Sequence, residues 1–450
     1  MTKNLTEGAP LPLILNFAAP LFLGNLLQQA YNLFDAAIVG RYLGSDALAA
    51  VGASSSVQFL VLGFCIGICT GFGIPFATYF GANKLRSMRR SVFNAIVVAV
   101  GFAAVLTVLC TVLCDDILRL LNSDERYFKD AYSYLFIIFL GIPFTIFYNF
   151  ISGMLRAVGD SRTPFIFLAV STVLNILLDL LLIVVFDAGV AGAAVATVAS
   201  QGLSAFSCLV YTVKRQPVLR IKRSEMRLNM KDVANHFMMG IPMGLQFSIT
   251  AIGSMYMQSA INALGAVYTT GFTAALKIKS LMFSPSDALA AAISVFASQN
   301  VGAGRVDRAR TGIGKGLVIG IIWGIIAGLI MIFGGRVISM MFIRPTDIPE
   351  LDAAGKYLYC LGFFMWLIPI LNITRMSTQG LGFSGRTIFA GVAEMAARVG
   401  MVKFFVPSYG FTAICFCDQA AWILAVMYTL PMCFYCLKKV EKRLSSAQTA

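Results

Sequence analysis

Charged residues are scarce in this chain, and histidine is almost absent. Of 450 residues, 12% are charged, and His236 is the only histidine. A soluble domain of this length carries about twice that share of charge. The sequence contains no Gly-rich loop ending in Lys-Ser or Lys-Thr, no GxSxG and no HExxH motif. These absences argue against a soluble enzyme and against ATP-driven transport by this chain alone.

Hydrophobic residues are correspondingly abundant. They make up 58% of the chain, and the mean hydropathy is +0.81. Apolar runs of about 18 residues or more, long enough to cross a bilayer, recur from end to end. We therefore predict an all-α membrane protein with about twelve transmembrane helices. The expected helices cover residues 13–39, 50–80, 91–114, 131–155, 164–186, 190–213, 233–260, 268–298, 312–335, 354–378, 387–406 and 411–437.

The net charge of +14 is distributed unevenly between these helices. Both termini and the even-numbered connections hold roughly three times as many Lys and Arg residues as the odd-numbered connections, which is the positive-inside pattern. We therefore expect a multi-pass protein of the cell inner (cytoplasmic) membrane with both termini in the cytoplasm. The basic residues would face anionic lipids. Because no soluble basic domain exists, nucleic acid is not an expected partner.

The chain repeats itself weakly around its longest polar connection, residues 214–232, which contains seven basic residues. "NFAAPLFLGN" with Pro20 matches "FMMGIPMGLQ" with Pro242, and "YFGANKLRSMRRS" matches "QNVGAGRVDRART". Six expected helices lie on each side, so both halves share one membrane orientation. The pattern predicts two pseudo-symmetric six-helix bundles as parallel repeats. The expected domains are an N-terminal lobe (1–213), a basic cytoplasmic linker (214–232) and a C-terminal lobe (233–450).

Four polar residues inside apolar runs of the first half form a candidate coupling site. Placing a carboxylate at bilayer depth costs about 2.5–3.5 kcal/mol, so Asp35 and Asp179 are expected to be functional. Asn175 lies four residues before Asp179 on the same helix face, and Thr197 lies in the next helix. These oxygens suit a small hard cation, and paired desolvated carboxylates could instead hold a proton. We predict Na+ or H+ as coupling ion, with no cofactor and no other metal; the alternative is that both acids serve packing or the interface.

Other polar residues in the expected helices are assigned to a structural ion pair or to a substrate cavity. Glu394 and Arg398, at i and i+4, are interpreted as a structural ion pair within one helix. For Lys277, Lys279 and Asp287, snorkelling to an interface is an equal alternative to lining a cavity. The predicted substrate-cavity residues are Gln28, Asn32, Gln201, Gln246, Lys277, Lys279 and Asp287.

Five sequence motifs of this chain resemble those of the multidrug and toxic compound extrusion (MATE) transporters, and most closely their bacterial DinF-like and MepA-like branch. The motifs occur in matching order and cover most of the chain. They are "NLFDAAIVGRYLGSDALAAVG" (32–52), "SGMLRAVGDSRTPFIF" (152–167), "NILLD" (175–179), "GAAVATVASQG" (192–202) and "ASQNVGAGR" (297–305).

The resemblance implies two six-helix lobes around a V-shaped cavity and export driven by Na+ or H+ antiport. It places the family's N-lobe cation site on the same four residues, Asp35, Asn175, Asp179 and Thr197. The acids that some members carry in two later helices are missing here. Gln246 and Thr250 occupy one of these helices, and Asn372 and Arg375 the other. This leaves open whether the C-terminal lobe holds a cation site.

The sequence therefore predicts a secondary active exporter of small, cationic or amphipathic organic molecules that works as a monomer in the lipid bilayer. One alternative is a flippase of a lipid-linked precursor, although such proteins usually line their cavity with several basic groups. A membrane-embedded enzyme is a second alternative, but the chain lacks a nucleophile–base set and metal-ligand spacing.

Overall fold

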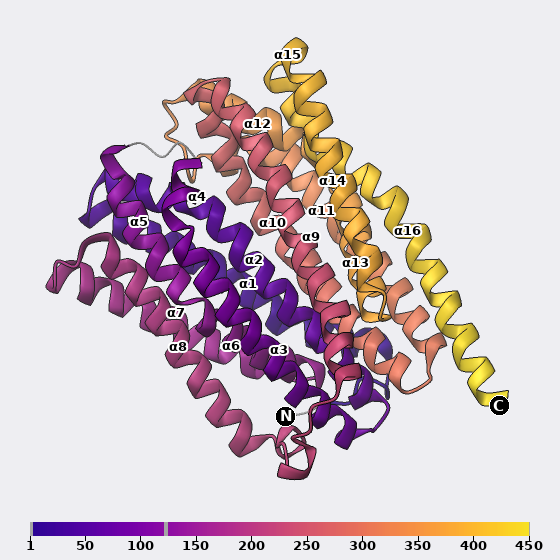
Figure 1. The fold of residues 1–450 in the computed structure, drawn as a ribbon. Helices are drawn as coiled ribbons and strands as arrows, with labels where there is room; N and C mark the ends of the chain where they lie inside the picture. The colour runs from indigo at the N-terminus through magenta and orange to yellow at the C-terminus, as the bar shows by residue number, and fades with distance from the viewer. Residues whose placement is uncertain (1–2, 121–124, 450) are drawn as a thin grey trace. The chain divides into compact units, whose positions relative to one another are not determined.

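The computed structural model describes residues 3–120 and 125–449, and every regular element in this part of the chain is helical (Figure 1). Nine of the described helices are long and apolar enough to cross a membrane, and two bent helix pairs raise this number to eleven. One further long helix, α14 (Ser384–Phe404), carries Glu394 and Arg398. The prediction of an all-α membrane protein with about twelve spanning helices is confirmed.

Two of the expected helices are broken. The helix expected at 131–155 is two helices, α5 (Glu125–Leu140) and α6 (Ile142–Ala157), bent by 45°. Gly141 separates them, and Pro143 stands in the first turn of α6, where its missing N–H leaves no helical bond unmade. The helix expected at 354–378 is likewise two helices, α12 and α13, bent by 60°.

The chain divides into two compact units. Unit 1 contains Leu23–Gly244 together with Lys3 and Asn4, and unit 2 contains Leu5–Phe22 and Leu245–Ala450. Two long helices, α1 (Pro10–Tyr42) and α9 (Met230–Ala263), therefore contribute to both units. Pro20 in α1 and Pro242 in α9 each lie within three residues of the boundary.

Unit 1 is held together partly by close approach of two backbones. A Cβ on Gly67 would lie 2.7 Å from the Cα of Gly244, and one on Gly71 would lie 2.6 Å from the carbonyl oxygen of Met239. Only glycine at these positions lets α2 and α9 pack this closely. Besides parts of α1 and α9, unit 1 contains α2 (Ser45–Gly81), α3 (Leu85–Val112), α4 (Cys114–Leu120), α5, α6, α7 (Arg162–Asp179), the π-helix η1 (Leu180–Val185) and α8 (Gly189–Arg215).

Unit 2 uses glycine in the same way. A Cβ on Gly324 would lie 2.7 Å from the Cα of Trp366, and one on Gly328 would overlap the carbonyl oxygen of Gly362. These contacts seat α11 against the break between α12 and α13. Besides parts of α1 and α9, unit 2 contains α10 (Ala266–Gly302), α11 (Val306–Ser339), α12 (Ile348–Gly362), α13 (Leu367–Gly380), α14, α15 (Val406–Tyr409) and α16 (Phe411–Thr449).

The internal repeat is visible in helix lengths. α1 and α2 have 33 and 37 residues, and α9 and α10 have 34 and 37. Each pair is joined at a glycine with positive φ, Gly44 at 91° and Gly265 at 106°. An L-residue with a side chain rarely adopts this backbone conformation, so the two turns share one requirement.

The outer surfaces of both units are apolar. Val112 and Phe333, for example, expose 72% and 82% of their areas. Large exposed apolar surface would be unfavourable in water, but it is expected where helices face lipid.

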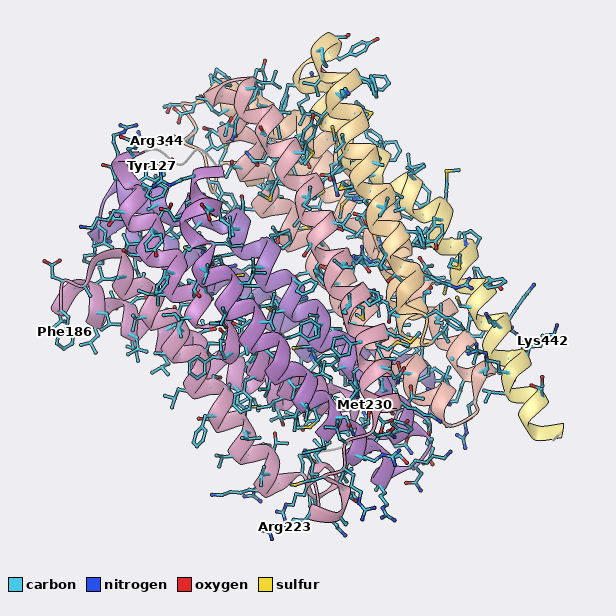
Figure 2. All side chains as sticks on the ribbon, in the orientation of Figure 1. Tyr127, Phe186, Arg223, Met230, Arg344 and Lys442 are labelled. Atoms are coloured by element: carbon cyan, nitrogen blue, oxygen red, sulfur yellow. The ribbon has the colours of Figure 1, made fainter. Side chains whose placement is uncertain are left out.

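The connection between α8 and α9 is fastened to α3. It contains two 3-10 turns, η2 (Pro217–Leu219) and η3 (Arg223–Glu225). Arg89 of α3 forms an ion pair of 2.7 Å with Glu225, and Arg90 forms one of 3.0 Å with Asp232 at the start of α9. Figure 2 labels Arg223 in this connection and Met230 at the start of α9. It is therefore an ordered part of unit 1.

Candidate functional site

Two buried carboxylates face each other inside unit 1. Asp35 on α1 is 8% exposed, and Asp179 at the end of α7 is fully buried. Their carboxyl groups lie close enough to interact directly. Both stand in helices that are apolar enough to span a membrane, where an unpaired carboxylate is costly.

A small polar network surrounds this acidic pair. Tyr31, one turn before Asp35 on α1, donates a hydrogen bond of 3.0 Å to Oγ1 of Thr197 on α8. The buried Asn175, one turn before Asp179, donates through Nδ2 to the same hydroxyl oxygen at 3.5 Å. The structure thus brings all four predicted coupling residues into one bundle, from three helices.

The helix changes its winding at this point. α7 ends at Asp179, and the next six residues continue as the π-helix η1. A π-turn widens the helix and is often found at functional sites. Here it lies between the buried carboxylate and the connection to α8.

Several oxygens of the cluster have no hydrogen-bond donor. Oδ1 of Asp35, Oδ1 of Asn175 and both carboxylate oxygens of Asp179 are buried and accept no hydrogen bond from a described residue. Buried polar atoms are normally satisfied, so such a set is exceptional. Carboxylate, amide and hydroxyl oxygens are the ligands that a small hard cation prefers. Among the described residues, no three His, Cys, Asp or Glu side chains cluster as a site for another metal.

Two tyrosines of this site were not predicted from the sequence. Tyr31 shares a helix face with Asp35 at i and i+4, so its spacing could have revealed it. Tyr134 on α5 is 3% exposed, interacts with Gln58 and lies within electrostatic range of both carboxylates. Tyr134 reaches the site because α5 packs beside it, and the spacing of residues along the sequence does not indicate this packing.

The other predicted polar residues of unit 1 lie on two of the same helices, α1 and α8. Gln28 and Asn32 are exposed on α1. Gln201 on α8 is half-buried, and its Oε1 accepts a hydrogen bond of 2.7 Å from Thr145 on α6.

Unit 2 contains a buried cluster of opposite charges. Asp418 on α16 accepts hydrogen bonds from Lys279, from the Tyr357 hydroxyl at 2.6 Å and from Arg398 at 3.0 Å. Arg398 also lies 3.5 Å from Glu394, one turn earlier on α14. A buried carboxylate with this many donors is held in place and compensated.

The cluster continues through α13 and α10. Arg375 pairs with Glu394 at 3.1 Å and donates at 2.7 Å to Asn372, which in turn donates at 2.6 Å to Asp287. Gln246 on α9 lies beside Gln379, 2.7 Å from its Nε2. Lys279, Asp287 and Gln246 are therefore engaged in contacts within unit 2.

Lys277 and Asp418 are two residues of unit 2 for which the structure adds to the sequence analysis. Lys277 is exposed, two residues before the engaged Lys279 on the same helix. Asp418, the acceptor at the centre of the cluster, was missed by the sequence analysis. An acid inside the apolar run "FTAICFCDQAAWILAV" is the signal that singled out Asp35, and it could have found Asp418.

Carboxylates buried within spanning helices in this way are typical of a multi-pass membrane transporter. Comparison with known proteins agrees with this class. The MatE family model matches residues 20–181 and 242–399. The chain belongs to the MatE family of multidrug and toxic compound extrusion transporters, whose members are transporters and not enzymes.

Individual relatives cover nearly the whole chain. The probable multidrug resistance protein YpnP of Bacillus subtilis is 33% identical over 421 residues, which is 93% of this chain and 91% of YpnP. The probable multidrug resistance protein NorM of Thermotoga maritima is 24% identical over 441 residues, covering 96% and 93%. A crystal structure of MATE in the bent conformation has a TM-score of 0.90 at 21% identity, covering 99% and 100%. This last similarity concerns the fold alone.

Proposed function

We propose that the chain is a secondary active exporter of several small organic molecules, driven by antiport of Na+ or H+. The observation that carries this proposal is the buried acidic pair, Asp35 and Asp179, with carboxylate oxygens that no described donor satisfies. Asn175 and Thr197 would complete the ion site. The names of the relatives support the substrate class, since two are called probable multidrug resistance proteins.

The proposed coupling follows from charge. With its ion absent, the site holds two interacting carboxylates in a low-dielectric region, which is unfavourable. Binding of a cation or a proton relieves this repulsion and stabilises the ion-bound site relative to the ion-free one. Rocking of the two lobes, 1–213 and 233–450, would then exchange the ion for a cationic or amphipathic substrate at the cytoplasmic membrane. Gln28 and Asn32, exposed on the helix that carries Asp35, are the proposed substrate contacts of unit 1.

A flippase of a lipid-linked precursor is less well supported. Such a protein needs basic groups free to bind a pyrophosphate, whereas Lys279, Arg375 and Arg398 are each paired with an acid. Of the two lysines predicted to line a cavity, Lys277 is exposed and Lys279 is paired with Asp418.

The decisive experiment compares Asp35→Asn and Asp179→Asn with Asp46→Asn, an exposed acid on α2. Each variant is expressed in an exporter-deficient host, and drug efflux is measured with ionophores that collapse the Na+ and H+ gradients separately. Because one pKa unit corresponds to about 1.4 kcal/mol, or tenfold in ion occupancy, we expect at least a tenfold loss of gradient-driven efflux at the two buried sites. Asp46→Asn should transport normally. Wild-type efflux by both buried variants, at equal protein level, would refute the coupling site.

A further inference from the structure

An apolar groove lies on unit 1, outside the acidic site. It has a volume of about 870 Å³ and is formed by α3, α6, α8 and the linker. These three helices lie side by side (Figure 1). Lining residues include Ile96 and Ala103 on α3, Phe144 and Phe150 on α6, and Leu209 on α8. The size falls within the range of about 300–1,000 Å³ typical of small-molecule sites.

The groove has the length of one leaflet. On α3 its lining runs from Val92 to Ala104, twelve residue steps. At about 1.5 Å per residue this is about 18 Å, slightly more than half of a hydrocarbon core of about 30 Å. A single extended apolar chain from one leaflet would therefore fill it.

One end of the groove carries positive charge. Arg220, in the linker, is the one charged residue among the described groove-lining residues. Its Nε and Nη2 donate to the carbonyl oxygens of Val213 and Lys214, at 2.6 and 2.9 Å, at the end of α8. These bonds leave Nη1 for another acceptor, and the exposed side chains of Lys214 and Lys222 lie close in sequence. The mouth is preformed, because the ion pairs of Arg89 and Arg90 hold the linker on α3.

We propose that this groove binds one acyl chain of an anionic phospholipid, from the leaflet on the linker side, with its phosphate at Arg220. A membrane supplies this ligand continuously, and basic pockets beside spanning helices bind anionic headgroups. A cationic drug does not fit, because no acid lines the described groove and a guanidinium stands at its mouth. The lipid site is thus separate from the proposed transport site.

The headgroup contact is tested by native mass spectrometry of the full-length protein, purified from vesicles of equal parts phosphatidylglycerol and phosphatidylethanolamine. We expect one retained phosphatidylglycerol in preference to phosphatidylethanolamine. Arg220→Gln should lower this preference about fivefold, the loss of one basic residue near a lipid surface. The control is Arg223→Gln, an exposed arginine of the same linker that does not line the groove. Equal retention of the two lipids by the wild type would overturn the proposal.

The chain contact is tested by filling the groove. Ala104→Trp places an indole in the groove from an exposed position on α3, whereas Val105→Trp changes the adjacent residue, which is 63% exposed and outside the groove. We expect Ala104→Trp to abolish lipid retention and Val105→Trp to leave it intact, with both variants eluting as folded protein. Retention by Ala104→Trp, or displacement of the lipid by millimolar inorganic phosphate or by a cationic dye, would contradict an anionic-lipid site.

Discussion

Arg89 holds Glu225 through two hydrogen bonds, from Nε to Oε2 at 2.8 Å and from Nη2 to Oε1 at 2.7 Å. Arg89 lies in the first turns of α3, and Glu225 ends the turn η3 of the linker, 136 residues later in the chain. The backbone N–H of Lys222 adds a third hydrogen bond to the carboxylate, at 2.9 Å. A paired arginine and carboxylate with an additional donor is a strong, directional contact.

The pair makes stability depend on pH. The hydrogen bonds from Arg89 lower the pKa of Glu225 from its ordinary value of 4.5 to about 2. Since the pKa is lower in the folded state, the stabilisation is complete above about pH 4.5 and is lost as the pH falls toward 2. We predict that Glu225→Gln lowers the free energy of unfolding by on the order of 1 kcal/mol at pH 7, after allowance for solvent screening.

This difference is measured as the shift in thermal unfolding between wild type and Glu225→Gln from pH 7 down to pH 3. The two curves should converge as the pH falls. Glu441→Gln, which removes the exposed partner of Arg310, is the matched control and should unfold like the wild type at every pH. A gap between Glu225→Gln and wild type that stays constant with pH would contradict the assignment.

The ion pair of Lys279 and Asp418 gives a second prediction. Removing one member of a buried pair leaves a charge uncompensated and costs about 3–5 kcal/mol. Arg398 and Tyr357 still hold Asp418 in Lys279→Met, so we expect a loss near the lower end of this range, measured by thermal unfolding in detergent. The double variant Lys279→Met/Asp418→Asn restores charge balance and should recover part of the loss.

Lys277→Met is the matched control for this experiment, because Lys277 is exposed two residues earlier on α10. It should keep wild-type stability. If Lys279→Met and Lys277→Met unfold at the same temperature, the cluster contributes little to the stability of unit 2.

A third prediction concerns the close contact of α2 with α9. A Cβ on Gly71 would lie 2.6 Å from the carbonyl oxygen of Met239, so Gly71→Val must separate the two helices. Overpacking of this kind costs about 1–3 kcal/mol, and we expect a lower yield of folded protein in size-exclusion chromatography. A Cβ on Gly101, in α3, meets nothing within 4 Å, so Gly101→Val should fold normally. Equal yields from both variants would show that the contact tolerates a side chain.

A fourth prediction concerns topology. The proposed cytoplasmic position of the linker predicts that Arg223→Cys reacts with an impermeant maleimide only after cells are permeabilised. Phe186 precedes the first residue of α8, at the end opposite the linker, so Phe186→Cys should react in intact cells. Background is low, since nine of the ten native cysteines are buried and Cys360 is half-buried. Labelling of Arg223→Cys in intact cells would reverse the proposed orientation.

Local spacing predicted what lies along one helix. Asn175 and Asp179 share a buried face of α7, as their i, i+4 spacing requires. The number and class of the helices also followed from the lengths of the apolar runs. The break at Gly141 was missed because the hydrophobic run continues through it, although a proline two residues later was a usable signal.

Contacts between side chains of different helices could not be predicted from the sequence. Glu394 and Arg398 do approach each other as their spacing suggested, but each also pairs with a residue from another helix, Arg375 and Asp418. Such partners depend on how helices rotate against each other, which is set by packing of side chains distant in sequence. For the same reason the sequence left Lys277 and Lys279 with the same two alternatives, while the structure exposes Lys277 and pairs Lys279 with Asp418.

The division of α1 and α9 has a consequence for how each unit is assembled. The first part of α1 belongs with the second half of the chain, and the first part of α9 belongs with the first half. Each repeat thus lends the opening segment of its leading helix to the other, which is the reciprocal exchange of a domain-swapped dimer. Each unit therefore needs a short segment from the other half of the chain to be complete. Because the linker joins the two halves covalently, this exchange is intramolecular and independent of protein concentration.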